Sequence, residues 1–170
     1  SYDGQGAVAT QAGKDYRKYA DDAKFEATTL IRFGRFDEVL ELDHRPDNSA
    51  SAAIYDFAKG YAMLKSGDPE GAQTTLTALR EYVASTDDKI RFHPAKNVVG
   101  VLVHILAGEI QLTDGKVEAA IDSFKQAVAL EDSLDYDEPE PLPFAARHWL
   151  GQTLLGAGQP TKAEAVFRAE

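Results

Sequence analysis

The chain has 170 residues, of which 44% are hydrophobic, and a formal net charge of −10 at pH 7. This length and content suffice to bury one core, and the absence of cysteine excludes disulfides and thiolate metal sites. The negative charge disfavours nucleic acid and anionic membranes as partners, because both are bound by clustered lysine and arginine.

Targeting signals are not evident in the sequence. No apolar run approaches the roughly 18 residues that span a bilayer, and the first residues lack the apolar core of a signal peptide. We therefore expect a soluble protein. The compartment stays open between the cytoplasm and, if a signal peptide has been removed, the periplasm. The start at a serine and the end inside a helical pattern also leave open a longer parent protein.

The first predicted helix pair covers about residues 14–44. Residues 1–12 are glycine-rich and weakly patterned, which indicates a flexible leader or the remnant of a preceding repeat. Apolar residues then recur at spacings of three and four from Tyr16 to Phe33, the period of an amphipathic helix. Gly34 ends this helix, and a short partner follows over 36–43.

The second predicted pair covers about residues 49–84. Pro46 pushes the residue before it out of the helical region, and Asn48 or Ser49 can cap the helix that follows. Gly67 stops that helix, and Pro69 starts the next one, since proline is tolerated where no donor is needed. Residues 85–93 are polar and irregular, so we expect a surface connection.

The third predicted pair covers about residues 94–130, with Pro94 opening its first helix. The apolar segment VVGVLVHIL within it also suits a buried strand. We favour a helix, because a lone strand would leave its backbone hydrogen bonds unpaired whereas a helix inside a repeat array is covered on both sides. Residues from Val117 to Leu130 form the expected partner helix.

The fourth predicted pair covers about residues 144–170 and follows an acidic segment. Six carboxylates and three prolines over 131–143 exclude a long helix there and indicate a solvated acidic connection. The inward residues of the next helix are expected to be Trp149, Leu150, Leu154 and Leu155. The chain is thus predicted to be all-α, a superhelix of about four antiparallel hairpins over residues 13–170, with no sheet.

A glycine, a turn glycine and an alanine recur at matching offsets in three of the predicted pairs. They are followed by an aromatic or leucine, as in Gly108, Gly115, Ala120 and Phe124. This spacing resembles the tetratricopeptide repeat of about 34 residues. The resemblance implies a helical solenoid whose inner groove binds an extended or helical peptide. The small residues Ala120 and Ala163 are then expected at tight helix contacts.

Residues 49–170 also resemble the C-terminal half of a bacterial tetratricopeptide-repeat family. In that family an acidic "ED.L.YDEP" segment precedes a hairpin of the form "R..LG..LL..G....AE.V", and both patterns stand in this chain. Members of the family are mostly of unassigned function. The resemblance therefore implies a longer parent protein and no particular reaction.

No catalytic or cofactor-binding pattern is present in the sequence. It has no cysteine nucleophile, no G-x-S-x-G turn and no phosphate-binding glycine loop, and its 28 acidic residues make adjacent carboxylates frequent by chance. We predict no enzymatic activity, no catalytic residues, no cofactor and no metal site. Whether the histidines or the acidic segment 131–140 bind a cation stays open, although that segment lacks the glycine and the acid spacing of a calcium loop.

The repeat pattern nominates six groove residues on the inward faces of the first helices. They are Phe57, Tyr61, Ile105, Glu109, His148 and Gln152. Aromatic side chains give contact area at low entropic cost, and carboxylate or amide groups can bond a peptide backbone. Alternatively, Phe57 and Ile105 belong to the core. The hypothesis is a protein-interaction or scaffold module for a neutral to basic peptide partner.

Self-assembly into a homo-oligomer through the end helices is the alternative function. The last predicted helix carries Val166 and Phe167 and has no following repeat to cover them.

Overall fold

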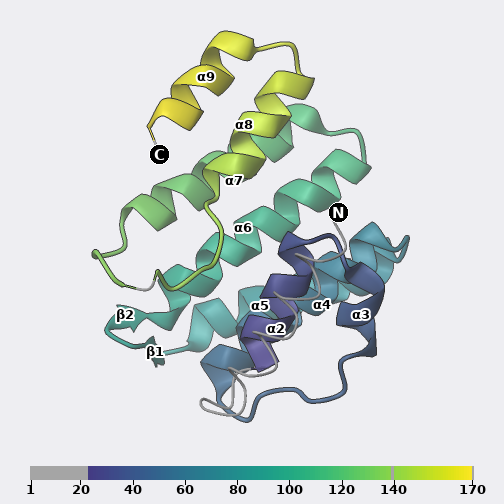
Figure 1. The fold of residues 1–170 in the computed structure, drawn as a ribbon, viewed down its shortest axis with the longest axis vertical. Coiled ribbons are helices and arrows are strands. Elements are labelled where there is room, and N and C mark those ends of the chain that lie inside the picture. The colour runs from purple at the N-terminus through teal and green to yellow at the C-terminus, as the bar shows by residue number, and fades with distance from the viewer. Residues whose placement is uncertain (1–22, 139, 170) are drawn as a thin grey trace, which may run out of the picture. The chain divides into compact units, whose positions relative to one another are not determined.

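The structure, a computed structural model, describes residues 23–138 and 140–169. Within these ranges eight α-helices follow one another as antiparallel pairs (Figure 1), which confirms the all-α fold. The chain divides into two compact units, one ending at Leu79 and one beginning at Arg80. The expectations for residues 1–12 and for the first helix up to residue 22 lie outside the described residues. The single repeat domain over 13–170 stays a prediction.

The first unit contains α2 (Ala23–Arg32), α3 (Phe36–Glu41), α4 (Ser49–Lys65) and most of α5 (Pro69–Ser85). Both α2 and α3 pack against α4. Lys59 of α4 donates hydrogen bonds of 2.8 and 2.7 Å to the carbonyls of Leu40 and Leu42, at the end of α3. The Lys59 ammonium thus satisfies carbonyls at the end of α3 that have no partner inside that helix. Asn48 caps α4 by accepting from the Ser51 amide at 3.0 Å, as predicted.

Every helix pair turns through a glycine in the left-handed region. The φ angles are 68° at Gly34, 89° at Gly67, 74° at Gly115 and 72° at Gly158. In each turn the glycine N–H donates to the carbonyl three residues earlier, and the next N–H donates to the carbonyl five residues earlier. This is the Schellman pattern, which ends a helix and satisfies its last carbonyls. Side chains disfavour this φ by about 1–2 kcal/mol, so the turns select glycine.

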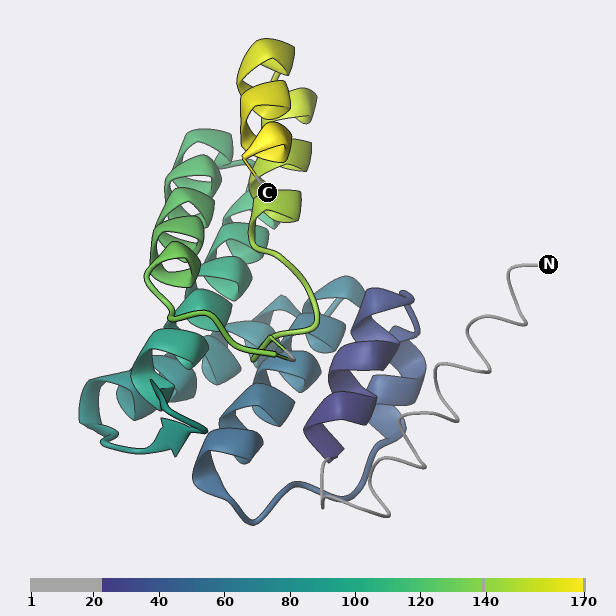
Figure 2. The same cartoon turned by 60° about the vertical axis from the view of Figure 1, so that its left-hand side comes forward.

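The second unit contains α6 (Ala95–Thr113), α7 (Val117–Asp132), α8 (Arg147–Gly156) and α9 (Pro160–Arg168), preceded by the end of α5 (Figure 2). Neighbouring helices pack in chain order, α6 on α7, α7 on α8 and α8 on α9. The segment VVGVLVHIL is helical, as predicted. By length and composition α6 is able to cross a membrane, which the sequence argument overlooked, but 72% of its apolar window is buried, as in the core helix of a soluble protein.

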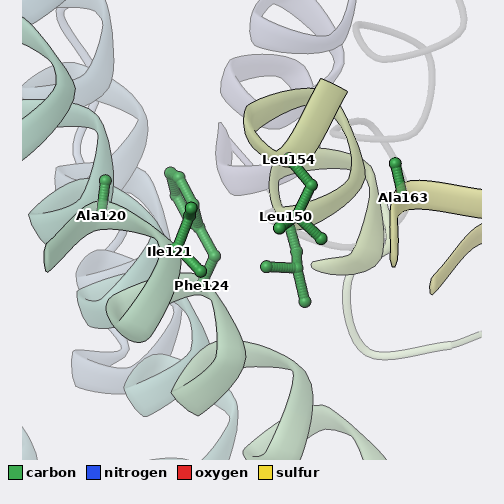
Figure 3. Packing of buried hydrophobic residues seen from close by; sticks show 6 residues of the cluster. All are labelled: Ala120, Ile121, Phe124, Leu150, Leu154 and Ala163. Atoms are coloured by element: carbon green, nitrogen blue, oxygen red, sulfur yellow. The ribbon is translucent and has the colours of Figure 1, made fainter. Parts of the chain in front are cut away.

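One hydrophobic cluster joins the last three helices of the second unit (Figure 3). It comprises Ala120, Ile121 and Phe124 of α7, Leu150 and Leu154 of α8, and Ala163 of α9. Ala120 and Ala163 have no exposed surface, so the predicted small-residue positions lie in the core. Leu155, predicted to face inward, is 52% exposed. The buried side of α8 is set by Leu150 and Leu154, one turn apart, and Leu155 lies off that side.

The connection between α5 and α6 contains a small sheet, so the prediction of no sheet is wrong. Strands β1 (Lys89–Ile90) and β2 (His93–Pro94) pair antiparallel, with Ile90 opposite His93. Arg91 adopts a φ of 58°, which lets the chain reverse between the two strands. Pro94 therefore lies in β2 and precedes α6, which begins at Ala95.

Residues 133–146, which connect α7 to α8, are hereafter the acidic loop.

Candidate functional site

Two of the six predicted groove residues lie wholly inside the protein. Phe57, on α4 in the first unit, and Ile105, on α6 in the second unit, both have 0% of their surface exposed. Neither side chain can reach a ligand from that position. These two residues therefore belong to the cores of their units, which was the alternative interpretation of the sequence.

Tyr61 is also on α4, and it is packed among other side chains. Its ring centroid lies 5.8 Å from that of Phe57 and 6.1 Å from that of Phe36. The Lys65 ammonium lies 5.2 Å from the Tyr61 ring centroid, within the range of a cation–π contact. Only 7% of Tyr61 is exposed. Tyr61 thus contributes mainly to packing, with a small accessible edge.

The exposed groove candidates are on α8. His148 and Gln152 are both exposed and stand four residues apart, so their side chains lie on one face of the helix. Glu109, on α6, is 7% exposed. Of the six candidates, His148 and Gln152 are the two exposed ones, an imidazole and an amide one turn apart on α8.

The acidic loop is closed at its base by two polar contacts between α7 and the start of α8. The Arg147 guanidinium donates to both carboxylate oxygens of Asp132, at 2.6 and 2.7 Å. The Glu131 carboxyl accepts from the Ala146 backbone N–H at 2.9 Å. The helix begins at Arg147 and not at the predicted Phe144, and this bond satisfies an amide that has no partner inside the helix.

Asp137 anchors the middle of the same loop, so the predicted solvated acidic connection is wrong at this residue. Asp137 is 6% exposed and lies 2.7 Å from Arg91 Nη1 and 3.3 Å from His93 Nε2. Arg91 also donates to the Glu138 carbonyl at 3.2 Å. His93 itself is 1% exposed. No signal in the sequence predicts this cluster, because Asp137 is more than forty residues from Arg91 and His93 and no local period links them.

A cavity of about 270 Å³ lies between the acidic loop and the helix ends at its base. Its charged lining consists of five carboxylates, those of Glu131, Asp132, Asp135, Asp137 and Glu140, and one guanidinium, that of Arg147. Burial raises the pKa of Glu131 to about 7; the Ala146 N–H and Arg147 oppose the shift, and Asp132 and Glu140 add to it. Such a lining favours cationic groups over anionic ones.

The structure offers no metal centre among the residues that it describes. Within 23–138 and 140–169, no three histidine, aspartate or glutamate side chains converge as metal ligands would. His104 is half-buried, and its pKa is lowered first by burial and then by the charge of Arg80. Both effects favour the neutral imidazole over the charged one, which suits packing on α6.

The comparison with protein families finds one repeat. Residues 145–169, which contain α8 and α9, match the model described as Tetratricopeptide repeat. No curated protein and no solved structure matches the chain. Tetratricopeptide repeats are in general non-catalytic modules of protein–protein interaction or scaffolding. The other helix pairs share the glycine turn of the matched repeat. In α6 and α7, as in α8 and α9, a glycine of the first helix (Gly108, Gly151) also lies against an aromatic ring of the second (Phe124, Phe167). Together with the matched repeat, these features support a protein of the tetratricopeptide-repeat type.

Proposed function

We propose that the chain is a protein-interaction or scaffold module that binds a peptide-like partner on the first helices of the helix pairs in its second unit. The observation that carries the proposal is the two-sided character of α8, inside the matched repeat. Leu150 and Leu154 bury one side, whereas His148 and Gln152 stay exposed one turn apart. An imidazole and an amide can both exchange hydrogen bonds with an extended peptide backbone.

The partner is proposed to be neutral to basic. The chain has a net charge of −10, and the cavity of the second unit is lined by five carboxylates against one guanidinium. This charge steers basic peptides toward the protein and slows acidic ones. The preference should weaken as salt shortens the Debye length toward about 8 Å at physiological ionic strength.

A peptide-library screen followed by titration calorimetry tests the proposal. His148→Ala and Gln152→Ala should each weaken binding of a selected peptide, because each removes one polar contact from the exposed face of α8. Thr161→Ala, at an exposed site on α9, is the matched control and should leave the affinity unchanged. Tyr61→Ala is informative only if its unfolding transition matches that of the wild type, because Tyr61 is largely buried.

The net charge of the selected peptides shows whether the protein prefers basic or acidic partners. Neutral to basic sequences with salt-sensitive affinity would support the proposal. Acidic sequences, or peptides whose binding survives both α8 substitutions, would contradict the assignment of the binding face to α8.

Self-association through the last hairpin is the second candidate function. Leu155 is 52% exposed and Phe167 is 38% exposed, both on this hairpin. A substitution of Phe167 would also disturb the hairpin, because its ring packs over Gly151. Leu155→Ser therefore tests self-association with less effect on the fold. Light scattering over a range of concentrations should show a dimer that this substitution removes. A wild-type protein that stays monomeric at every concentration would exclude this function.

A further inference from the structure

The base of the acidic loop joins the last turn of α7 to the first turn of α8. Glu131 lies in the last turn of α7, and its carboxyl accepts a hydrogen bond from the Ala146 N–H at 2.9 Å. Beside it, Asp132 and Arg147 form a two-bond ion pair. The half-buried Glu131 side chain also lines the cavity of about 270 Å³ beneath the loop. A change in the Glu131 carboxyl therefore acts on the point where the loop is closed.

The charges around Glu131 are mostly of its own sign. Asp132 stands next to it on α7, the loop contributes Asp135, Tyr136, Asp137 and Glu140 to the shared cavity, and α8 contributes Arg147. Arg147 is held by both oxygens of Asp132, and Asp137 is held by Arg91 and His93. An ionised Glu131 thus adds one more negative charge to a confined acidic cavity, whereas a protonated one adds none.

We propose that Glu131 is a proton-controlled clasp, which closes the acidic loop over its cavity when the carboxyl is protonated and loosens the loop when the carboxyl is ionised. Both forms can accept from the Ala146 N–H, but the ionised form must also give up hydration and face its acidic neighbours. Opening of the loop returns Glu131 to water and relieves both penalties. The proposal goes beyond partner binding, since it concerns the loop whatever the partner is.

The pKa of Glu131 determines whether a rise in pH opens or closes the loop. The pKa of Glu131 is raised from 4.5 to about 7 in the closed structure. The closed loop is therefore favoured fully below about pH 4.5, and this advantage is lost as the pH rises through 7. Complete rehydration on opening would change the opening equilibrium by roughly 300-fold. Because the side chain is only half-buried, we expect about a tenfold change.

Amide hydrogen exchange at pH 5 and pH 8, with each rate divided by its intrinsic rate at that pH, tests the clasp. The amide of Ala146, which donates to the Glu131 carboxyl, should lose about tenfold in protection at pH 8. The amide of Leu134 donates to the Glu131 backbone carbonyl at the start of the loop, and its protection should fall with that of Ala146 as the loop opens. Amides in the middle of α4, which belongs to the first unit, should not change. In Glu131→Gln the side chain stays neutral and still accepts from Ala146, so protection should be equal at the two pH values.

Asp135→Asn is the matched control, because Asp135 lines the same cavity without touching the clasp; this variant should keep the tenfold change. Wild-type protection that is equal at pH 5 and 8, or a Glu131→Gln variant that keeps the pH dependence, would overturn the proposal. If Glu131→Gln fails to fold, a carboxyl-carbon NMR titration of the wild type decides. The Glu131 carboxyl and the Ala146 amide should titrate together near pH 7, and titration of Glu131 near 4.5 would overturn the clasp.

Discussion

The ring of Phe167 lies directly over Gly151, and a Cβ built on Gly151 would stand 2.2 Å from Phe167 Cζ. Phe124 and Gly108 repeat this relationship at the same sequence spacing, with a Cβ 2.4 Å from Phe124 Cε1. In both helix pairs, therefore, a glycine on the first helix makes room for an aromatic ring from the second. The contact explains why glycine and aromatic residue recur together along the sequence.

Replacing Gly151 with alanine should destabilise the last hairpin by about 1–3 kcal/mol, because the added methyl overlaps the Phe167 ring. Gly156→Ala is the control, since α8 also contains this glycine and nothing lies within 4 Å of its added Cβ. The control should be neutral or stabilising by up to about 1 kcal/mol, from helix propensity. Urea unfolding measures both. Equal effects of the two substitutions would show that the ring does not constrain Gly151.

Ala120→Leu should cost about 1–3 kcal/mol through overpacking, because Ala120 has no exposed surface and belongs to the cluster of α7, α8 and α9. The neighbouring Ala119 is exposed on the same helix, so Ala119→Leu should leave the melting temperature nearly unchanged. Thermal unfolding of the two variants checks the register of α7. An Ala120→Leu protein as stable as the wild type would mean that the register is wrong.

Asp137→Asn should destabilise the second unit by about 1–3 kcal/mol, because it removes the buried carboxylate that pairs with Arg91 and His93. The loss stays below that of a fully buried ion pair, since Arg91 is 49% exposed and can return to water. Asp135→Asn, at an exposed loop position, is expected to change stability by less than about 0.5 kcal/mol. Denaturant unfolding distinguishes the two, and similar effects would contradict the anchoring role of Asp137.

Acidification should remove stability through His104. Burial and Arg80 lower the pKa of this imidazole below its ordinary value of 6.5, so the unfolded chain binds the proton first and stability falls as the pH drops below about 6.5. His104→Gln should flatten this part of the profile. Glu131 acts in the opposite direction between pH 4.5 and 7, so melting temperatures should be compared in a Glu131→Gln background. A profile unchanged by His104→Gln would refute the assignment.

The helix pairs were predictable because their signals are local. Gly34, Gly67, Gly115 and Gly158 end helices through their own backbone conformation, and the apolar period of three and four shows which residues share a face of a helix. Even VVGVLVHIL, which suits strand or helix by composition, was decided correctly by asking where its backbone hydrogen bonds would go. The observed helix ends differ from the predicted ones, as at Arg147, and Leu155 is exposed although it was predicted to face inward.

The burial of Asp137 in the acidic loop and the exposure of the groove candidates were decided by the tertiary structure alone. Local sequence cannot show that Asp137 is buried against Arg91 and His93, because the partners meet only after α6 and α7 have folded between them. The same holds for the groove candidates: the repeat pattern nominated six positions, but packing buried Phe57 and Ile105 completely and left His148 open. Periodicity determines which residues share a face of a helix, whereas the neighbours brought by the rest of the chain determine whether that face meets water.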